Sequence, residues 1–347
     1  MRKLFFTIIM IFTLTRTVFA AEFTAPPVPD SGSHYMPDQS ESFMDGLWYV
    51  IRSAMTELRP EFMRASGTCV SVIALVMIQS VFYGFAERSR RITDIGSTVG
   101  IGVLLLQPTH SLIQLGTDAV TELSEYGKLL IPVLAAATAA QGGVNSSNTL
   151  FTVTTVFASA LSNLIGKLIV PLIYIFLCLA IANRAIGENL LKKMSDFVKW
   201  IMTWALKISI YAFTGFTSVT GVISGSTDVS VLKATKIAIS GSVPVIGNIL
   251  SDASETILVS VGLMKSAVGI YGIWAIIATW ITPFLKIGVQ YLLLKATSAV
   301  CGVYGTKNAC GMLQDFTTAM GLILASVSTI SLLLLISVVC FMKGVAG

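Results

Sequence analysis

Lysines placed within apolar sequence are the residues of this chain most able to do chemistry inside a membrane. Lys167, Lys207, Lys265 and Lys286 each stand in a long apolar run. A charge at the bilayer centre costs at least ~2.5 kcal/mol, so such a lysine faces water or an acidic partner, or extends to an interface. Lys167 and Lys207 lie well inside their runs and are candidates for a polar path or a subunit contact. Snorkelling at the end of a shorter span is the alternative.

A second candidate region, residues 240–272, combines helix-breaking residues with acids. Irregular backbone at membrane depth is tolerated only where protein or water covers it, and the small residues of this segment allow helices to approach closely. The segment is therefore a candidate pore-facing or subunit-packing element, and a bent packing helix is the alternative. Its candidate residues are Pro244, Gly247, Asn248, Asp252 and Glu255.

The residues needed for common enzyme chemistry are scarce. The chain has two histidines, His34 and His110, and contains no H-E-x-x-H, G-x-S-x-G or G-x-x-x-x-G-K-[ST] motif. Its five cysteines have no metal-binding spacing. Cys301 and Cys310 flank a short turn and could form a disulfide only if that turn lies outside the cell. We therefore expect a non-enzymatic protein without a cofactor, a metal or a nucleic-acid partner.

The amino-acid composition indicates whether these residues lie in water or in a lipid bilayer. Of 347 residues, 54% are hydrophobic and 12% are charged, which is half the charged fraction of an ordinary soluble chain. Many apolar runs reach the length of about 20 residues that a helix needs to cross a bilayer. The expected fold is an all-α polytopic membrane protein with roughly 6–10 spans, some of them re-entrant hairpins broken by proline.

The N-terminal third divides into three parts. Residues 1–20 are typical of a signal peptide, with Arg2 and Lys3 before a short apolar core, and an uncleaved first helix is the alternative. Residues 21–66 form an acidic external leader and an amphipathic helix. That helix lies on the outer membrane face, packs on a partner, or folds onto this protein. Residues 67–347 form the multi-span domain.

Charge placement predicts the topology of that domain. The basic cluster at 87–91 follows an apolar run and belongs inside, so residues 95–115 return outward to an acidic loop at 118–125. Basic residues at 184–199 mark the inside again, so an odd number of crossings lies within 128–186. Three short crossings or one crossing plus a re-entrant hairpin satisfy this count. Trp200 and Trp204 are expected at the inner interface.

Proline spacing indicates a duplicated unit. Pro132 and Pro171 are separated by the same interval as Pro244 and Pro283. The two copies would cover 92–203 and 204–341 as a parallel repeat of the kind that transport proteins use. The last span then runs outward, and the turn between Cys301 and Cys310 lies inside, which argues against a disulfide there.

The sequence also resembles a known family. The stretch S-V-P-V-I-G-N-I-L-S-D-A-S-E-T in the 240–272 segment is similar to the hallmark region of the stage III sporulation protein AE family. The signal peptide, the helix ending Leu58-Arg59-Pro60-Glu61, and T-P-F-L-K from Thr282 to Lys286 agree with it. The resemblance covers essentially the whole mature chain, although only the central motif is distinctive, and it carries over no catalytic residue.

The resemblance implies a place and a set of partners. Members of this family are mother-cell proteins of the outer membrane around the engulfed forespore in endospore-forming bacteria. They join a channel-like, secretion-like assembly with other stage III sporulation A-operon proteins, including a cytoplasmic ATPase and ring-forming subunits. That assembly meets stage II sporulation protein Q from the forespore. A stand-alone secondary transporter or permease is the alternative function.

Overall fold

A computed structural model describes the chain over five stretches. These are residues 24–37, 43–85, 90–186, 189–242 and 247–343. Side chains are described for 24–37, 45–82, 91–186, 191–218 and 266–343. The predicted signal peptide at 1–20 lies outside the described residues.

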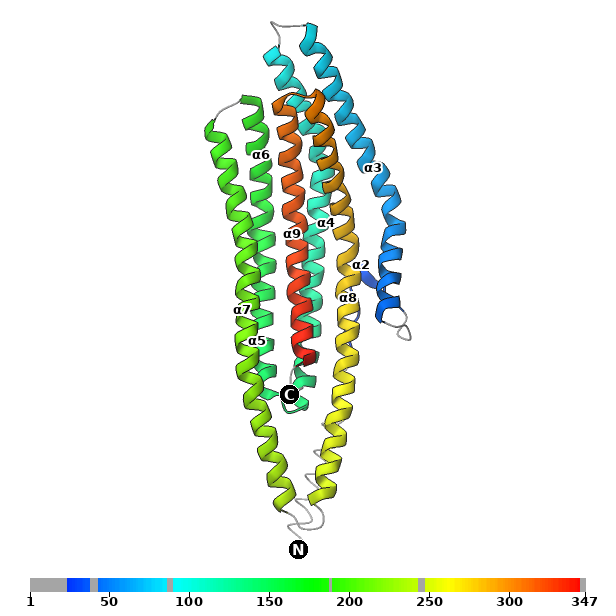
Figure 1. Ribbon diagram of the computed structural model, residues 1–347, viewed down its shortest axis with the longest axis vertical. Coiled ribbons are helices and arrows are strands. Elements are labelled where there is room, and N and C mark those ends of the chain that lie inside the picture. Colours follow the sequence, from blue (N-terminus) through cyan, green and yellow to red (C-terminus); the bar gives the residue numbers. More distant parts are fainter. Residues whose placement is uncertain (1–23, 38–42, 86–89, 187–188, 243–246, 344–347) are drawn as a thin grey trace.

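The described residues form helices and no strand. A short N-terminal helix precedes a bundle of long ones joined by brief connections (Figure 1). In chain order the elements are α2 (Asp30–Ser33), α3 (Phe43–Phe85), α4 (Arg90–Ala140), α5 (Val144–Leu164), η2 (Ile165–Ile169), α6 (Val170–Ile186), α7 (Asn189–Ser242), α8 (Gly247–Tyr304) and α9 (Lys307–Lys343).

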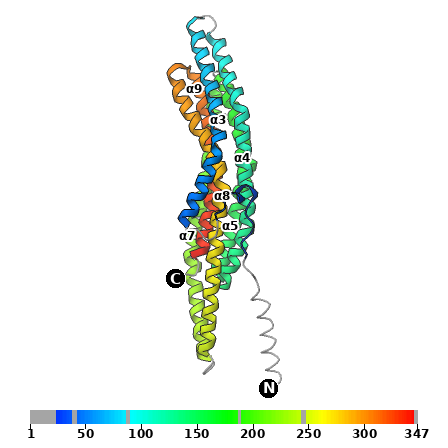
Figure 2. The same ribbon diagram turned by 90° about the vertical axis from the view of Figure 1, so that its right-hand side faces the viewer.

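The helices alternate in direction along one long axis. The ends of the α3–α4, α6–α7 and α8–α9 pairs meet at the upper end of Figure 1, and the α4–α5 turn lies toward the opposite end. The α3–α4 hairpin extends furthest at the upper end, whereas α7 and α8 extend furthest at the other (Figures 1 and 2). α9 lies centrally and packs mainly against α8 and α4.

Close helix contacts at glycine hold this core together. A Cβ on Gly116 of α4 would stand 2.6 Å from Ile323 of α9, and one on Gly127 would stand 2.7 Å from Leu334. Gly272 of α8 approaches Leu130 of α4 in the same way. Small residues permit this close packing between apolar helices, so α9 is enclosed along its length and supplies many of the fully buried residues.

Three prolines of the described part lie within helices and do not reverse the chain. Pro132 lies inside α4 and Pro283 inside α8, and both helices continue through them. Pro171 lies in the first turn of α6. The interruptions expected at Pro132 and Pro171 therefore do not turn the chain, because packed neighbours stabilise a helix across the missing N–H. Pro244 lies outside the described residues.

At Pro171 the helix adjusts by one wide turn. The ring of a proline removes the hydrogen bond to the carbonyl four residues earlier and crowds that carbonyl, here that of Lys167. Directly upstream, η2 is a π-helical turn, and the N–H of Val170 donates to the carbonyl of Ile165. Such π turns accommodate local strain without ending a helix. α5, η2 and α6 therefore form one ascending unit.

Two further expectations about the spans need correction. The acidic stretch 118–125 lies within α4, not in a loop, and the chain from 128 to 186 turns once, at 141–143. Five candidate membrane spans occur among the described residues, in agreement with the expected all-α polytopic membrane protein. They are Asp45–Phe82, Arg91–Ala140, Val144–Ile186, Ser266–Tyr304 and Lys307–Lys343.

The predicted repeat agrees with the helix directions. From residue 92 the chain descends in α4, ascends through α5 to α6 and begins to descend in α7; from 204 it descends in α7, ascends in α8 and descends in α9 (Figure 1). Pro171 and Pro283 lie in the two ascending units. The equivalence of the two halves residue by residue stays a prediction.

Candidate functional site

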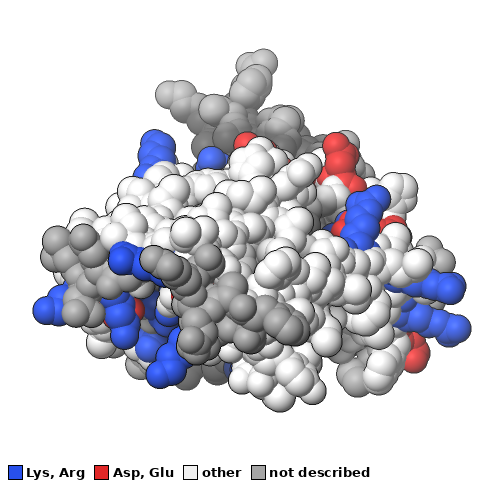
Figure 3. All heavy atoms as spheres, turned by 90° about the horizontal axis from the view of Figure 1, so that it is seen from above, with Lys and Arg blue, Asp and Glu red and all other residues white. Residues whose placement is uncertain are grey.

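Basic residues gather at the upper end of the bundle in Figure 1, which we call the basic end. Arg91 begins α4, Arg184 ends α6, Lys192 and Lys193 begin α7, and Lys307 begins α9. Seen from above, Lys and Arg lie around the rim of the molecule (Figure 3). The three basic connections that the sequence assigned to one side of the membrane therefore share one end of the fold.

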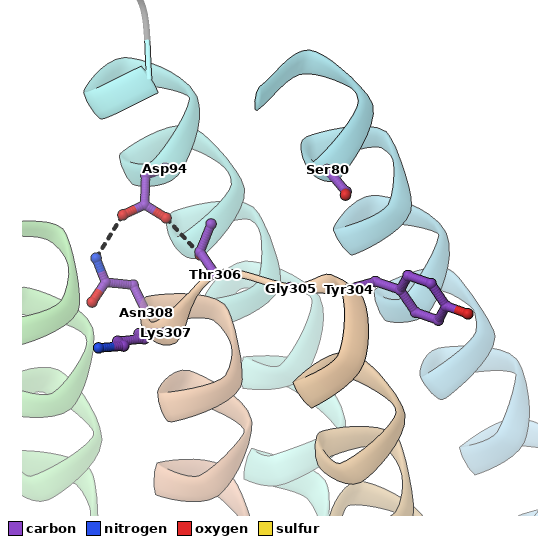
Figure 4. Close-up of a pocket in the computed structure, with 7 residues that line it drawn as sticks. All are labelled: Ser80, Asp94, Tyr304, Gly305, Thr306, Lys307 and Asn308. Atoms are coloured by element: carbon purple, nitrogen blue, oxygen red, sulfur yellow. Dashed lines mark hydrogen bonds between the residues drawn. The ribbon is translucent and has the colours of Figure 1, made fainter. Parts of the chain in front are cut away.

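A cluster of polar side chains ties three helix ends together there. The Oδ1 atom of Asp94 accepts hydrogen bonds from Gln79 Nε2 at 3.0 Å and from Thr306 Oγ1 at 2.7 Å. Its Oδ2 atom accepts from Asn308 Nδ2 at 2.6 Å (Figure 4). We call these four residues the Asp94 cluster. It links α3, α4 and the α8–α9 turn across more than 200 residues of sequence.

The position of Asp94 follows from the electrostatics of a helix start. Thr306 caps α9, since its Oγ1 accepts from the N–H of Ala309 at 3.4 Å and its carbonyl accepts from Cys310 at 3.1 Å. The unpaired N–H groups of a helix N-terminus favour a negative charge nearby. Asp94 supplies that charge from a different helix.

Gln79 is the most enclosed member of the Asp94 cluster. Only 2% of its surface is exposed, and its Nε2 also donates to Thr306 Oγ1 at 3.0 Å. Because its Nε2 donates to both Asp94 and Thr306, this side chain links α3 to α4 and to the α8–α9 turn.

A pocket of about 600 Å³ opens beside the Asp94 cluster. Tyr304 and Lys307 project on either side of the turn, and Asp94 lies on α4 above it, facing Thr306 and Asn308 (Figure 4). Carboxylate, amide, hydroxyl and ammonium groups line it together, so it can accept a polar segment of another molecule. The lining residues are Ser80, Asp94, Tyr304, Gly305, Thr306, Lys307 and Asn308.

A second polar link joins α6 to α9 near the same end. Arg184 Nε lies 3.1 Å from Asp315 Oδ2, and both side chains are about one-fifth exposed. The guanidinium passes directly over Gly311, where a Cβ would stand 2.2 Å from Arg184 Cζ. Gly311 therefore provides the space in which this ion pair forms.

The N-terminal segment 24–37, which we call the strap, packs through α2 against the middle of α8 near Thr279 and lies beside α4 and α3 (Figure 2). Ser31 donates to the carboxylate of Glu122 on α4, and Tyr35 donates to Glu57 on α3. Tyr35, Val50 and Trp274 form a small apolar cluster separate from the main core. Burial, together with the bond to Glu57, raises the pKa of the Tyr35 hydroxyl.

The amphipathic helix expected at the end of residues 21–66 is the first part of α3. α3 runs without a break from Phe43 to Phe85, so this helix and the first crossing are one element. Its face at Val50 and Ala54 packs on α8. Of the alternatives that the sequence left open, the structure shows packing on this protein's own chain.

The lysines singled out by sequence lie on the outside of the bundle. Lys167 on η2 and Lys207 on α7 are exposed, and Lys207 Nζ stands 5.9 Å from the ring of Trp204. Lys286 is half-buried. The structure does not bring Lys167 or Lys207 to the Asp94 cluster. The remaining candidates, Pro244, Gly247, Asn248, Asp252 and Glu255, lie outside the described side chains, as does Lys265.

The side chains of Cys301, Cys310 and His110 pack or form hydrogen bonds within the bundle. Cys301 is buried, and the thiol of Cys310 donates to its carbonyl at 3.2 Å; both thiols are free. His110 Nδ1 lies 2.7 Å from the hydroxyl of Tyr174. Among the described residues there is no group of three or more His, Cys, Asp or Glu side chains able to hold a metal ion.

Sequence reasoning missed the two polar links. Asp94 and Asp315 are single acids next to apolar runs, and a search for lone acids as well as lone lysines would have found them. Their partners could not be read from the sequence, because Asn308 lies 214 residues from Asp94 and Asp315 lies 131 residues from Arg184. Only the packing of α9 beside α4 and α6 brings these groups together.

The long apolar helices and their buried interfaces define an all-α polytopic membrane protein. The sequence profile described as Stage III sporulation protein AE matches residues 38–344. The chain belongs to the stage III sporulation protein AE family.

A relative of the same name also matches the chain. The chain is 25% identical over 235 residues to Stage III sporulation protein AE of Bacillus subtilis strain 168. The matched region is 68% of this chain and 59% of that relative, so less than two thirds of the relative's length is spanned. No solved structure matches the chain.

Proposed function

We propose that this protein is a non-enzymatic integral-membrane subunit of the sporulation channel, a secretion-like complex that links mother cell and forespore and is needed for late forespore development. Membership of the stage III sporulation protein AE family carries this proposal. The long all-α bundle supports it, because such a bundle suits a membrane platform. The protein acts in the mother-cell-derived outer membrane around the forespore.

The basic end is the side on which cytoplasmic partners act. Basic connections favour the cytoplasmic side of a membrane, and the pocket beside Asp94 opens there (Figure 4). The partners are other proteins of the stage III sporulation A operon, including a cytoplasmic ATPase and ring-forming subunits. Stage II sporulation protein Q is an indirect partner across the intermembrane space.

Deletion of the gene tests the proposal in the cell. We expect normal vegetative growth and spore development that stops after engulfment, with forespore-specific late reporter expression lost. Complementation with the wild-type chain should restore spores. Normal numbers of heat-resistant spores from the deletion strain would exclude the proposed role.

A stand-alone secondary transporter is the second candidate, supported by the repeated helix directions. The purified chain in liposomes distinguishes the two. A subunit should move no solute down an imposed ion gradient without its partners, whereas a transporter should accumulate one. Co-purification of the tagged chain with the cytoplasmic ATPase from sporulating cells would favour the subunit.

A further inference from the structure

The outward face of α7 differs in chemistry from that of the other long helices. Its exposed side chains at three- and four-residue intervals are four aromatic rings and two lysines. Phe197, Trp200, Trp204 and Tyr211 are 60, 56, 45 and 67% exposed. Together with the exposed Lys193 and Lys207 they form a line along one side of the helix, which we call the α7 stripe.

The aromatic rings of the α7 stripe contact one another. Phe197 stacks on Trp200 with ring centroids 6.1 Å apart, and Trp200 lies 6.3 Å from Trp204. Lys207 Nζ stands 5.9 Å from the Trp204 ring. Neither Lys193 nor Lys207 has an ion-pair partner among the described residues. The contacting rings of Phe197, Trp200 and Trp204 therefore lie between two lysines without an ion-pair partner in the described part, and Tyr211 lies beyond Lys207.

A face exposed only to acyl chains has another composition. The outward face of α4 is aliphatic, with exposed Val99, Val103, Leu104 and Leu106. Within its described residues α7 is not among the helices apolar enough to cross a membrane, although α9 and the α5–α6 unit beside it are. Tryptophan and tyrosine concentrate at the level of lipid headgroups, where a lysine reaches phosphate.

From these observations we propose that the α7 stripe binds the headgroups of anionic phospholipids. The aromatic rings lie at the boundary between headgroups and acyl chains, and Lys193 and Lys207 contact lipid phosphates. Charge complementarity sets the choice of lipid, since an anionic headgroup retains a net negative charge that a zwitterionic one lacks. Several Lys and Arg side chains gather on the α7 side of the molecule in Figure 3.

Fluorescence quenching in nanodiscs tests this site with the full chain. One quarter of the phosphatidylcholine is replaced by brominated phosphatidylglycerol or, in parallel, by brominated phosphatidylcholine. The stripe signal is the part of the quenching that is lost in the W200F/W204F variant. We expect brominated phosphatidylglycerol to quench that signal roughly twofold more strongly, and 0.5 M salt to reduce the difference.

Matched lysine variants identify the groups responsible. K193Q and K207Q together should bring the two brominated lipids to equal quenching. Lys295→Gln is the control, because Lys295 is also an exposed lysine over an aromatic ring, 5.8 Å from Tyr291, but lies on α8. Equal quenching by both lipids in the wild-type chain would overturn the proposal. So would stripe tryptophans that neither lipid quenches, since protein would then cover them.

Discussion

Asp94 is the residue on which the geometry of the basic end depends. Its carboxylate accepts three side-chain hydrogen bonds and lies beside the start of α9. Hydrogen bonds to a charged group each contribute about 1.5–3 kcal/mol. We expect Asp94→Ala to lower the free energy of unfolding by about 2–4 kcal/mol, measured by thermal denaturation in detergent.

Ser80→Ala is the matched control for Asp94→Ala, because Ser80 lines the same pocket and is exposed. Such a surface change should stay within about 0.5 kcal/mol of the wild type. Equal midpoints for the two variants would show that the Asp94 cluster does not stabilise the bundle.

Gly311 makes a second prediction at the scale of a residue. A methyl group there would displace the Arg184 guanidinium and separate it from Asp315. We expect Gly311→Ala to cost about 1.5–3 kcal/mol, the value of a hydrogen bond to a charged group. Thermal denaturation of Gly302→Ala gives the comparison, since a Cβ at Gly302 meets nothing within 4 Å.

The two glycine variants are expected to shift the thermal midpoint in opposite directions. Alanine is favoured over glycine inside a helix by up to about 1 kcal/mol, so Gly302→Ala should raise the midpoint slightly. If Gly311→Ala stabilised the protein to the same degree, then the Arg184–Asp315 pair would contribute nothing.

The strap shows how one element is held by few contacts. Tyr35 anchors it between α3 and α8, and its pKa is raised in the folded state by burial and by Glu57. A raised pKa means that folding favours the protonated hydroxyl. This stability is complete below the unfolded pKa of about 10 and is lost as the pH rises through the folded pKa.

Absorbance at 295 nm measures this ionisation directly. The difference between the alkaline titrations of the wild type and Tyr35→Phe isolates Tyr35, and we expect its midpoint to lie above pH 10. In the wild type, we expect the strap to detach as Tyr35 ionises at high pH, and the mobility of a spin label on the strap would report this. Tyr35→Phe should remove this pH-dependent detachment. A midpoint at the ordinary value would mean that the strap does not cover Tyr35.

Sequence predicted the helical character of the elements but not where they end. Apolar runs indicated spans correctly at 67–86 and 95–115, because hydropathy reports the solvent. Pro132 and Pro171 were read as interruptions, yet α4 continues through Pro132, and a π-helical turn carries the helix up to Pro171. Whether a proline ends a helix depends on what packs around it, which is a property of the assembled bundle.

The same limit applies to the candidate site. Charge assigned the basic residues next to α4 and α7 to one side, and the repeat assigned the 301–310 turn to the same side; Arg91, Lys192 and Lys307 do share one end. The Asp94 cluster was invisible because its members come from three distant segments. Lys167 and Lys207 stood out in sequence, yet both lie on the outer surface.

The whole molecule has a polarity that labelling can test. We expect the basic end to lie in the cytoplasm and the α4–α5 turn outside. In a chain with Cys178 changed to Ser, an impermeant maleimide added to intact cells should label Asn148→Cys and leave Lys307→Cys unlabelled. Both positions are exposed at opposite parts of the bundle. In permeabilised cells both variants should be labelled. Labelling of Lys307→Cys in intact cells would show that the topology is the reverse of the one proposed.

The central position of α9 has a consequence for biosynthesis. α9 leaves the ribosome after the other described helices, yet α4 and α8 pack around it. Thr306 and Asn308 emerge 212 and 214 residues after Asp94. At about 5–20 residues per second, this is a wait of roughly 10–40 s. During that time the earlier helices are in the membrane with an unfilled centre, so a nascent chain interrupted before residue 307 is a natural target for membrane proteases.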